Sequence, residues 1–354
     1  MQKLTNSTRN QHYIAQVEQR LNSSSNLTSL SNPRNAKIFE FKISDIKEGS
    51  HKPSLKLMGN KSIHSVLSVQ DIFTIQHLPN GLSVNFESLF QRYENDFSNH
   101  VNLFLDCVVK IKDTIPPDQE SIESHDTNLQ GYIKCVYKYK IMNWLRNPFH
   151  IKTVLKNFSP FGSYVIQSQN GLDLYNAIDT INQSQCNYIC TRFSISIDEY
   201  KEWLRLILLF LYQDSSCHVT VLDDYVDNFF SATDLSTSAY IFYYDTDSPL
   251  LPDSAIVVDE VKGNPSFYMN ISKNCLLLIQ HVVIDNEQSK ERMDKIGVSE
   301  EQREKLNAML AGNKRVKVFL NDLRVLNGFN EFCVGTASSV VYSSSNKVHD
   351  FVVE

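Results

Sequence analysis

The stretch Tyr132–Phe158, YIKCVYKYKIMNWLRNPFHIKTVLKNF, combines a helical pattern with an unusual charge composition. Its apolar residues fall mostly three or four positions apart, at Ile133, Val136, Tyr137, Ile141 and Trp144. This spacing predicts an amphipathic helix with most lysines off the apolar side. A second helix should begin at Asn147-Pro148, because Asn is a good N-cap and Pro suits the first turn.

The charges of the chain are segregated along the sequence. Residues 127–172 contain no carboxylate, and residues 206–261 contain ten Asp or Glu but no Lys or Arg. The formal net charge of the whole chain is −6. The total charge therefore gives no attraction to nucleic acid or to an anionic membrane, so any such binding would need a local basic patch.

The most regular helical pattern precedes this stretch. It follows the turn signal LPNG (78–81), and its apolar residues are Phe86, Phe90, Tyr93, Phe97, Val101, Phe104, Val108 and Ile111. Their spacing predicts a helix of about seven turns. Pro116-Pro117 should end it, and the acidic segment up to Asp126 is expected to be an exposed linker. A chain of 354 residues fits a single large domain or two closely packed lobes, with a possible boundary near 113–128.

Other segments carry strand and helix signals. KIFEFKI (37–43) alternates apolar and polar residues, and the clusters HVTVL (218–222), AYIFYY (239–244) and SAIVV (254–258) predict three further strands. Ser196-Ile-Asp-Glu199 and Ser299-Glu-Glu-Gln302 fit capping boxes, and a helical period is expected from 316 to 332. The sequence therefore predicts an α+β fold, rich in helix, with a modest mixed or antiparallel sheet from residues 36–43 and 219–283.

The seven cysteines are odd in number and scattered, and no charged-then-apolar leader opens the chain. Reduced thiols and a cytoplasmic location are the expectation. The apolar run Leu206–Tyr212 is far shorter than the roughly 20 residues needed to cross a bilayer, so no membrane partner is expected.

One functional hypothesis uses both charged segments. Basic side chains beside exposed aromatic rings would follow a nucleic-acid backbone, and the candidates are Lys134, Lys138, Lys140, Arg146, Lys152 and Lys156. Clustered carboxylates would hold Mg²⁺, and the candidates are Asp223, Asp224 and Asp234. Together they predict a metal-assisted, nuclease-like enzyme acting on nucleic acid.

The alternative is that the two segments dock on one another, or that the aromatic residues are core and the lysines a solvated face. The protein would then be a non-catalytic interaction module or accessory subunit that binds a protein partner. The sequence contains no glycine-rich phosphate loop, no G-x-S-x-G and no H-E-x-x-H. These absences argue against nucleotide-driven, Rossmann-type, α/β-hydrolase and zincin chemistry.

Four segments resemble a mostly bacterial family of uncharacterised proteins. QHYIAQ (11–16) matches an opening His-Tyr-Val-Pro-Gln motif except at Ala15, and MNWLRNPFHIK (142–152) is similar to a helix with Arg before a small residue and Pro. Thr233-Asp234 stands where the family has Ser-Asp, although Leu235-Ser236 replaces Asn-Pro, and LNGFNEFCVGTASSVVYSS (326–344) resembles its closing helix and strand. The resemblance implies His12, Arg146 and Asp234 as candidate catalytic positions and an accessory or antiviral defence role, without assigning a reaction.

Overall fold

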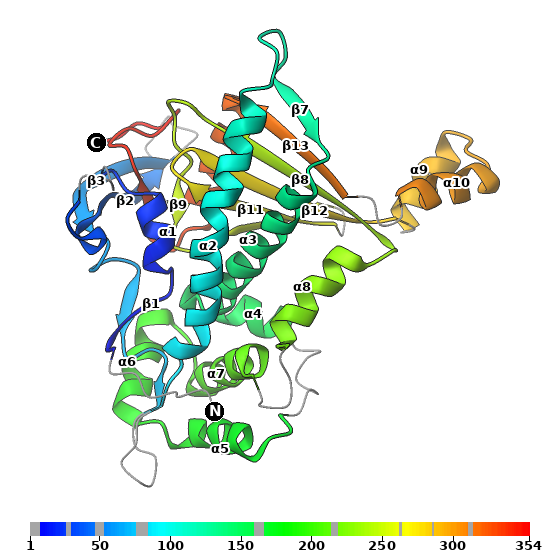
Figure 1. Cartoon of the computed structure of the whole chain (residues 1–354). Coiled ribbons are helices and arrows are strands. Elements are labelled where there is room, and N and C mark those ends of the chain that lie inside the picture. Colours follow the sequence, from blue (N-terminus) through cyan, green and yellow to red (C-terminus); the bar gives the residue numbers. More distant parts are fainter. Residues whose placement is uncertain are drawn as a thin grey trace.

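A computed structural model describes residues 8–25, 30–46, 53–75, 84–158, 166–213, 219–261, 264–284, 287–310 and 314–354. Within these ranges the chain folds as α+β, rich in helix, with sheets that are mixed or antiparallel (Figure 1). The fold class predicted from the sequence is confirmed.

The largest sheet has six strands. Their order across the sheet is β10 (Val257–Val261), β11 (Asn264–Ser272), β12 (Cys275–Val283), β8 (Leu235–Tyr243), β13 (Lys314–Leu320) and β7 (Ser121–Ser124). β8 and β13 run parallel, and the other neighbouring pairs are antiparallel. A parallel pair needs a long crossover, and the chain between β12 and β13 carries two helices.

Successive side chains of a strand point to opposite faces of the sheet, and each face of this sheet packs against a different hydrophobic cluster. On β12, Cys275, Leu277 and Ile279 belong to the main core, whereas Leu276 belongs to a second cluster. The main core lies under α2 (Glu87–Lys112) and α3 (Thr127–Leu145), which cross one face of the sheet in Figure 1. The second cluster includes α11 (Leu323–Thr336) and part of the four-stranded sheet.

The four-stranded sheet has the order β3 (Pro53–Ser62), β2 (Lys37–Ile46), β14 (Val340–Ser343) and β9 (Leu251–Pro252). Two small antiparallel pairs join β1 (Asn10–His12) to β4 (Ser68–Gln70) and β5 (Thr74–Ile75) to β6 (Val84–Asn85). Helix α1 (Gln16–Leu21) follows β1 directly. The strand expected at 37–43 is present as β2, and α1 contacts α3 through Glu18 and Lys140.

A helical layer lies beyond the lower ends of α2 and α3 in Figure 1. It contains α4 (Ile151–Asn157), α5 (Gln169–Ala177), α6 (Gln183–Phe193), α7 (Ile197–Leu211) and α8 (Val221–Ser231). The capping box predicted at Ser196 and Glu199 is present. Trp203 on α7 is fully buried and its Nε1 donates a hydrogen bond to the Leu145 carbonyl oxygen at 2.7 Å, which ties this layer to the end of α3.

Helices α9 (Glu287–Lys295) and α10 (Glu300–Leu310) project from one side of the molecule (Figure 1). The predicted cap of α10 is confirmed, since Ser299 N donates to Gln302 Oε1 at 3.0 Å and Gln302 N donates to Ser299 Oγ at 3.3 Å. Ile296, between the two helices, is 77% exposed.

Three local predictions are wrong. In HVTVL, His218 lies outside the described residues, and Thr220 is the N-cap of α8 rather than part of a strand. Residues 314–320 form strand β13, so the predicted helical period begins only at Leu323. Residues 121–124 form edge strand β7 instead of belonging to an exposed linker.

Candidate functional site

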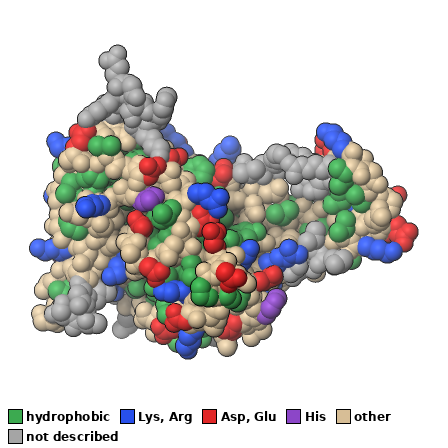
Figure 2. Space-filling model, turned by 90° about the horizontal axis from the view of Figure 1, so that it is seen from above, with side chains coloured by type: hydrophobic (Ala, Val, Ile, Leu, Met, Phe, Trp, Pro, Cys, Tyr) green, Lys and Arg blue, Asp and Glu red, His purple; other side chains and the backbone are tan. Residues whose placement is uncertain are grey.

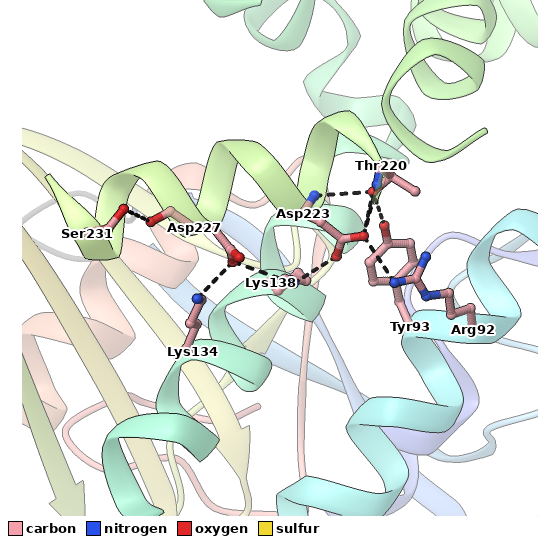
Figure 3. A network of polar contacts seen from close by, with 8 residues as sticks. All are labelled: Arg92, Tyr93, Lys134, Lys138, Thr220, Asp223, Asp227 and Ser231. Carbon is pink, nitrogen blue, oxygen red and sulfur yellow. Dashed lines mark hydrogen bonds and ion pairs between the residues drawn. The ribbon is translucent and has the colours of Figure 1, made fainter. Parts of the chain in front are cut away.

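The basic and acidic segments meet at the contact between α3 and α8 (Figure 3). Lys138 Nζ lies 2.7 Å from Asp223 Oδ1 and 3.8 Å from Asp227 Oδ1, and Lys134 Nζ lies 2.9 Å from the same Asp227 oxygen. Arg92 of α2 donates from Nη2 to Asp223 Oδ2 at 3.0 Å. Three predicted site residues, Lys134, Lys138 and Asp223, therefore come together, but as partners that neutralise each other. This contact agrees with the alternative that the basic and acidic segments dock on one another.

Asp223 also holds the first turn of α8. Its Oδ2 accepts hydrogen bonds from Thr220 N at 3.1 Å and Thr220 Oγ1 at 3.0 Å, and its own N–H donates to Thr220 Oγ1 at 3.1 Å. Burial opposes the charge of Asp223, but Lys138, the Thr220 backbone and Arg92 together hold the pKa of its carboxyl below the usual value. The Asp223 carboxylate thus has a structural role as cap and ion-pair partner.

Two other predicted basic residues are fully buried. Lys140 forms an ion pair with Glu18 of α1, and both side chains are 0% exposed. Arg146, the C-cap of α3, donates from Nη1 to Glu94 Oε1 at 2.7 Å, and its guanidinium carbon lies 4.8 Å from the centre of the Phe90 ring. Lys140 and Arg146 therefore cannot follow a nucleic-acid backbone on the surface. The prediction that α3 has one apolar side fails because its C-terminal half is buried on all sides.

His12 and Arg146 belong to one polar region between β1, α1, α2 and α3, in which His12 is half-buried and Arg146 is buried. Burial, followed by the positive charge of Arg146 and by His64, lowers the pKa of His12 to about 4. His12 Nε2 lies 2.9 Å from Gln16 Nε2, and His12 Nδ1 lies 3.3 Å from Gln19 Nε2. A neutral His12 ring has one N–H and one acceptor nitrogen. It fits these contacts when one of the two glutamine amides turns its oxygen towards the ring N–H. Two of the three catalytic candidates thus share one region.

The same region contains a second perturbed carboxyl group. Burial, offset by Arg146 and reinforced by Glu94, raises the pKa of Glu87 to about 7. Arg146 Nε and Nη2 have no hydrogen-bond partner among the described residues, nor has Glu87 Oε1. A neutral imidazole and a carboxyl group titrating near pH 7 are groups that can move protons. However, neither of the two cavities described below is lined by His12, Glu87 or Arg146.

The three predicted metal ligands do not converge. Asp223 and Asp224 lie in the first turn of α8, where Asp224 is exposed, and Asp234 is exposed just before β8. The 11 residues of α8 span about 16 Å at 1.5 Å per residue, so the helix separates the two ends. No group of three or more His, Cys, Asp or Glu side chains suited to a metal ion occurs within the described ranges. Asp234 shares no interaction with His12 or Arg146 in the described part of the chain.

Lys152 and Lys156 lie on α4, and both are exposed. They are the only two of the six predicted nucleic-acid contacts that lie largely in solvent. On the face shown in Figure 2, basic and acidic side chains are interspersed. The segregation of charge along the sequence is therefore not reproduced on that face.

A cavity of about 260 Å³ opens beside the ionic network, and we call it the α3–β13 pocket. Its walls come from α3, the end of α8, β8 and the start of β13, and its lining is Thr127, Gln130, Gly131, Ile133, Lys134, Asp227, Phe230, Ser231, Thr237, Ala239, Lys314, Arg315 and Val316. Its described lining residues include three cations and one carboxylate. Lys314 and Arg315 are exposed, and within the described residues neither has an acidic partner.

Sequence reasoning missed Lys314 and Arg315 in this pocket. They open a segment that carries a helical period as well as the β-branched residues of a strand. Strand β13 runs parallel to β8, with Lys314 opposite Thr237, and this pairing brings it beside the N-terminal part of α3. Recognising β13 as a strand would have been the first step towards placing the two residues.

Comparison of the chain with protein-family models, with curated proteins and with solved structures gives no match. The resemblance to the family with the His-Tyr-Val-Pro-Gln opening therefore stays a prediction, as does the defence role that it implies. Among the described helices, none is long and apolar enough to span a membrane.

Proposed function

We propose that the protein is an interaction module that binds an acidic segment of a protein partner in the α3–β13 pocket. The observation that supports the proposal is an excess of positive charge in the pocket. Its described lining contains the cations Lys134, Lys314 and Arg315 and the single carboxylate Asp227. A volume of about 260 Å³ is below the roughly 300 to 1,000 Å³ of small-molecule sites but suits one or two side chains. An acidic side chain supplies the missing negative charge.

The surroundings of the pocket favour a protein partner over a nucleic acid. The start of β13 lies on the side of the molecule from which α9 and α10 project (Figure 1). Ile296 and Leu306 on that projection are exposed, and apolar contacts of this kind belong to protein interfaces more than to phosphate backbones. Nucleic-acid binding instead needs an extended basic surface, whereas most of the predicted lysines are buried or paired.

Metal-assisted cleavage of nucleic acid stays a prediction without support from the geometry, because Asp223, Asp224 and Asp234 lie at two ends of α8. A cytoplasmic location also stays a prediction. It rests on the cysteines, of which the six in the described residues form no disulfide.

The proposal is tested with a fluorescein-labelled octaglutamate peptide, followed by anisotropy at low and moderate salt. We expect the peptide to bind to the wild type, with an affinity that falls as salt rises. Lys314→Glu should weaken binding by at least tenfold, because it replaces an attractive charge by a repulsive one. Lys152→Glu is the matched control, since it makes the same change on exposed α4 outside the pocket, and it should bind like the wild type.

A single-stranded ten-residue oligothymidylate of similar charge separates the two partner classes. Tighter binding of the oligonucleotide than of the peptide, lost in Lys314→Glu, would replace the proposal by nucleic-acid recognition. Equal effects of Lys314→Glu and Lys152→Glu would show that only the overall charge matters and would also overturn it.

A further inference from the structure

A second cavity, of about 660 Å³, lies between the end of α1, the C-terminal half of α2 and the turn between β11 and β12. We call it the α1–α2 cavity. Lys273 N donates to the Leu21 carbonyl oxygen at 3.0 Å, so the turn and the helix end that form two of its walls are joined directly. Its volume falls within the roughly 300 to 1,000 Å³ typical of small-molecule sites.

The charged residues that line this cavity are both cations. Arg20 is half-buried and Lys273 is exposed, and no Asp or Glu among the described residues lines the cavity. Within the described residues, neither side chain has an ion-pair partner. Burial lowers the pKa of Arg20, while Tyr139 and Glu94 oppose that shift and Arg34 adds to it. A half-buried guanidinium in direct contact with no described carboxylate gains from an anion that reaches it.

Two hydroxyl groups add hydrogen-bond donors to the same wall. Ser25 Oγ accepts a hydrogen bond from Lys37 N at 3.0 Å, and Ser272 Oγ accepts one from Asn274 N at 3.3 Å. A hydroxyl has one donor besides its acceptor positions. In the described part of the chain, neither hydroxyl hydrogen has an acceptor. Ser272 lines the cavity and is only 6% exposed.

Ser23, Ser24 and Asn274 add further polar groups to the wall, and the remaining lining residues are apolar. Leu21, Leu105 and Val109 line it together with the ring of Tyr243. A ligand that fits has an anionic group at Arg20, Lys273, Ser25 and Ser272 and an uncharged body against the apolar side. Two cations match the double negative charge of a phosphate monoester better than the single charge of a carboxylate.

We infer that the α1–α2 cavity binds a small organic phosphate monoester about the size of a nucleoside monophosphate. This site is separate from the α3–β13 pocket, and no lining residue is shared by the two. It gives the protein a small-molecule ligand in addition to the proposed protein partner. Arg20 and Lys273 bind the phosphate, and the serine hydroxyls fix its orientation.

The inference is tested by isothermal titration of the full chain with adenosine 5′-monophosphate, adenosine and inorganic phosphate. The monophosphate should bind with one-to-one stoichiometry, inorganic phosphate at least tenfold more weakly, and adenosine more weakly still. Arg20→Gln and Lys273→Gln should each lower the affinity for the monophosphate at least tenfold. Lys110→Gln is the matched control, because Lys110 is an exposed lysine next to Val109 that does not line the cavity.

Lys273→Gln keeps the test decisive if Arg20→Gln fails to fold, since Lys273 is exposed. Equal binding of adenosine and its monophosphate would overturn the inference, as would no binding of the monophosphate at millimolar concentration. An effect of Lys110→Gln as large as that of Lys273→Gln would do the same. Lys314→Glu changes only the α3–β13 pocket and should leave monophosphate binding unchanged. The two proposals can therefore fail independently of each other.

Discussion

His281 shows how one buried side chain makes the stability of the protein depend on pH. The residue is 1% exposed, its Nδ1 lies 3.0 Å from Thr237 Oγ1, and the rings of Tyr137, Phe229 and Phe267 surround it. Burial lowers the pKa of His281 to about 4. Protonation in the folded state would place an unpaired charge among aromatic rings.

The pKa of His281 gives a prediction with a definite sign. An unfolded histidine binds a proton below about pH 6.5, whereas the folded one stays neutral down to about 4. Its contribution to stability is thus complete above pH 6.5 and is lost as the pH falls towards 4. We expect the loss in free energy of unfolding between pH 7 and pH 5 to be about 2 kcal/mol smaller in His281→Gln than in the wild type.

Urea denaturation at the two pH values measures this difference. The same loss of stability in both proteins would show that His281 is not held neutral in the folded state. The substitution also alters packing, and that effect is present at every pH. The change in the free energy of unfolding between pH 7 and pH 5 is therefore compared, not the free energy at one pH.

The sequence alone was enough to predict part of the charged cluster between α3 and α8. The sequence pointed to Lys134, Lys138 and Asp223, and these residues do lie together, but their pairing depends on α8 docking against α3. Composition does not reveal which lysine is buried. Lys140 looks like its neighbours in the sequence, and only its place opposite Glu18 makes burial tolerable.

At the scale of elements, α1 is held to α3 by a buried ion pair. Lys140 contacts Glu18 Oε1, and Asn143 Nδ2 donates to Glu18 Oε2 at 2.6 Å. Helix α1 has only six residues, too few to be stable alone in water. Its position therefore depends on tertiary contacts, which include this fully buried ion pair.

We expect Lys140→Met to lower the free energy of unfolding by about 3–5 kcal/mol, because it leaves Glu18 buried without its cation. The double variant Glu18→Gln with Lys140→Met should recover most of that loss, since an amide oxygen can still accept from Asn143. Urea denaturation of both variants checks the prediction. A double variant no more stable than Lys140→Met would mean that the buried charge is not the cause.

The elements themselves were predicted unevenly, for physical reasons. Helix α2 was predicted correctly because its apolar residues keep a helical period over seven turns. The start of α8 was read as a strand from its β-branched residues, yet the capping box of Thr220 and Asp223 and the contact with Tyr93 outweigh that preference. β13 was read as helix because its short strand pattern runs directly into α11.

At the scale of the whole molecule, the segregation of charge along the sequence ends partly in an internal contact. Asp223 and Asp227 of α8 neutralise Lys134 and Lys138 of α3, whereas Lys140 and Arg146 pair with Glu18 and Glu94 outside the acidic segment. The α3–β13 pocket lies where this neutralisation is incomplete. Lys134 and Asp227 are both partly exposed there, and an exposed ion pair contributes little, so an acidic ligand can compete with Asp227 for Lys134.

Competition between Asp227 and an acidic ligand is tested by the affinity of Asp227→Asn for the octaglutamate peptide, compared with the wild type at the same salt concentration. We expect Asp227→Asn to bind the peptide more tightly, by roughly two- to fivefold, because the variant removes a competing negative charge and releases Lys134. Unchanged or weaker binding would contradict this expectation, since Asp227 would then not compete with the ligand for the cations of the pocket.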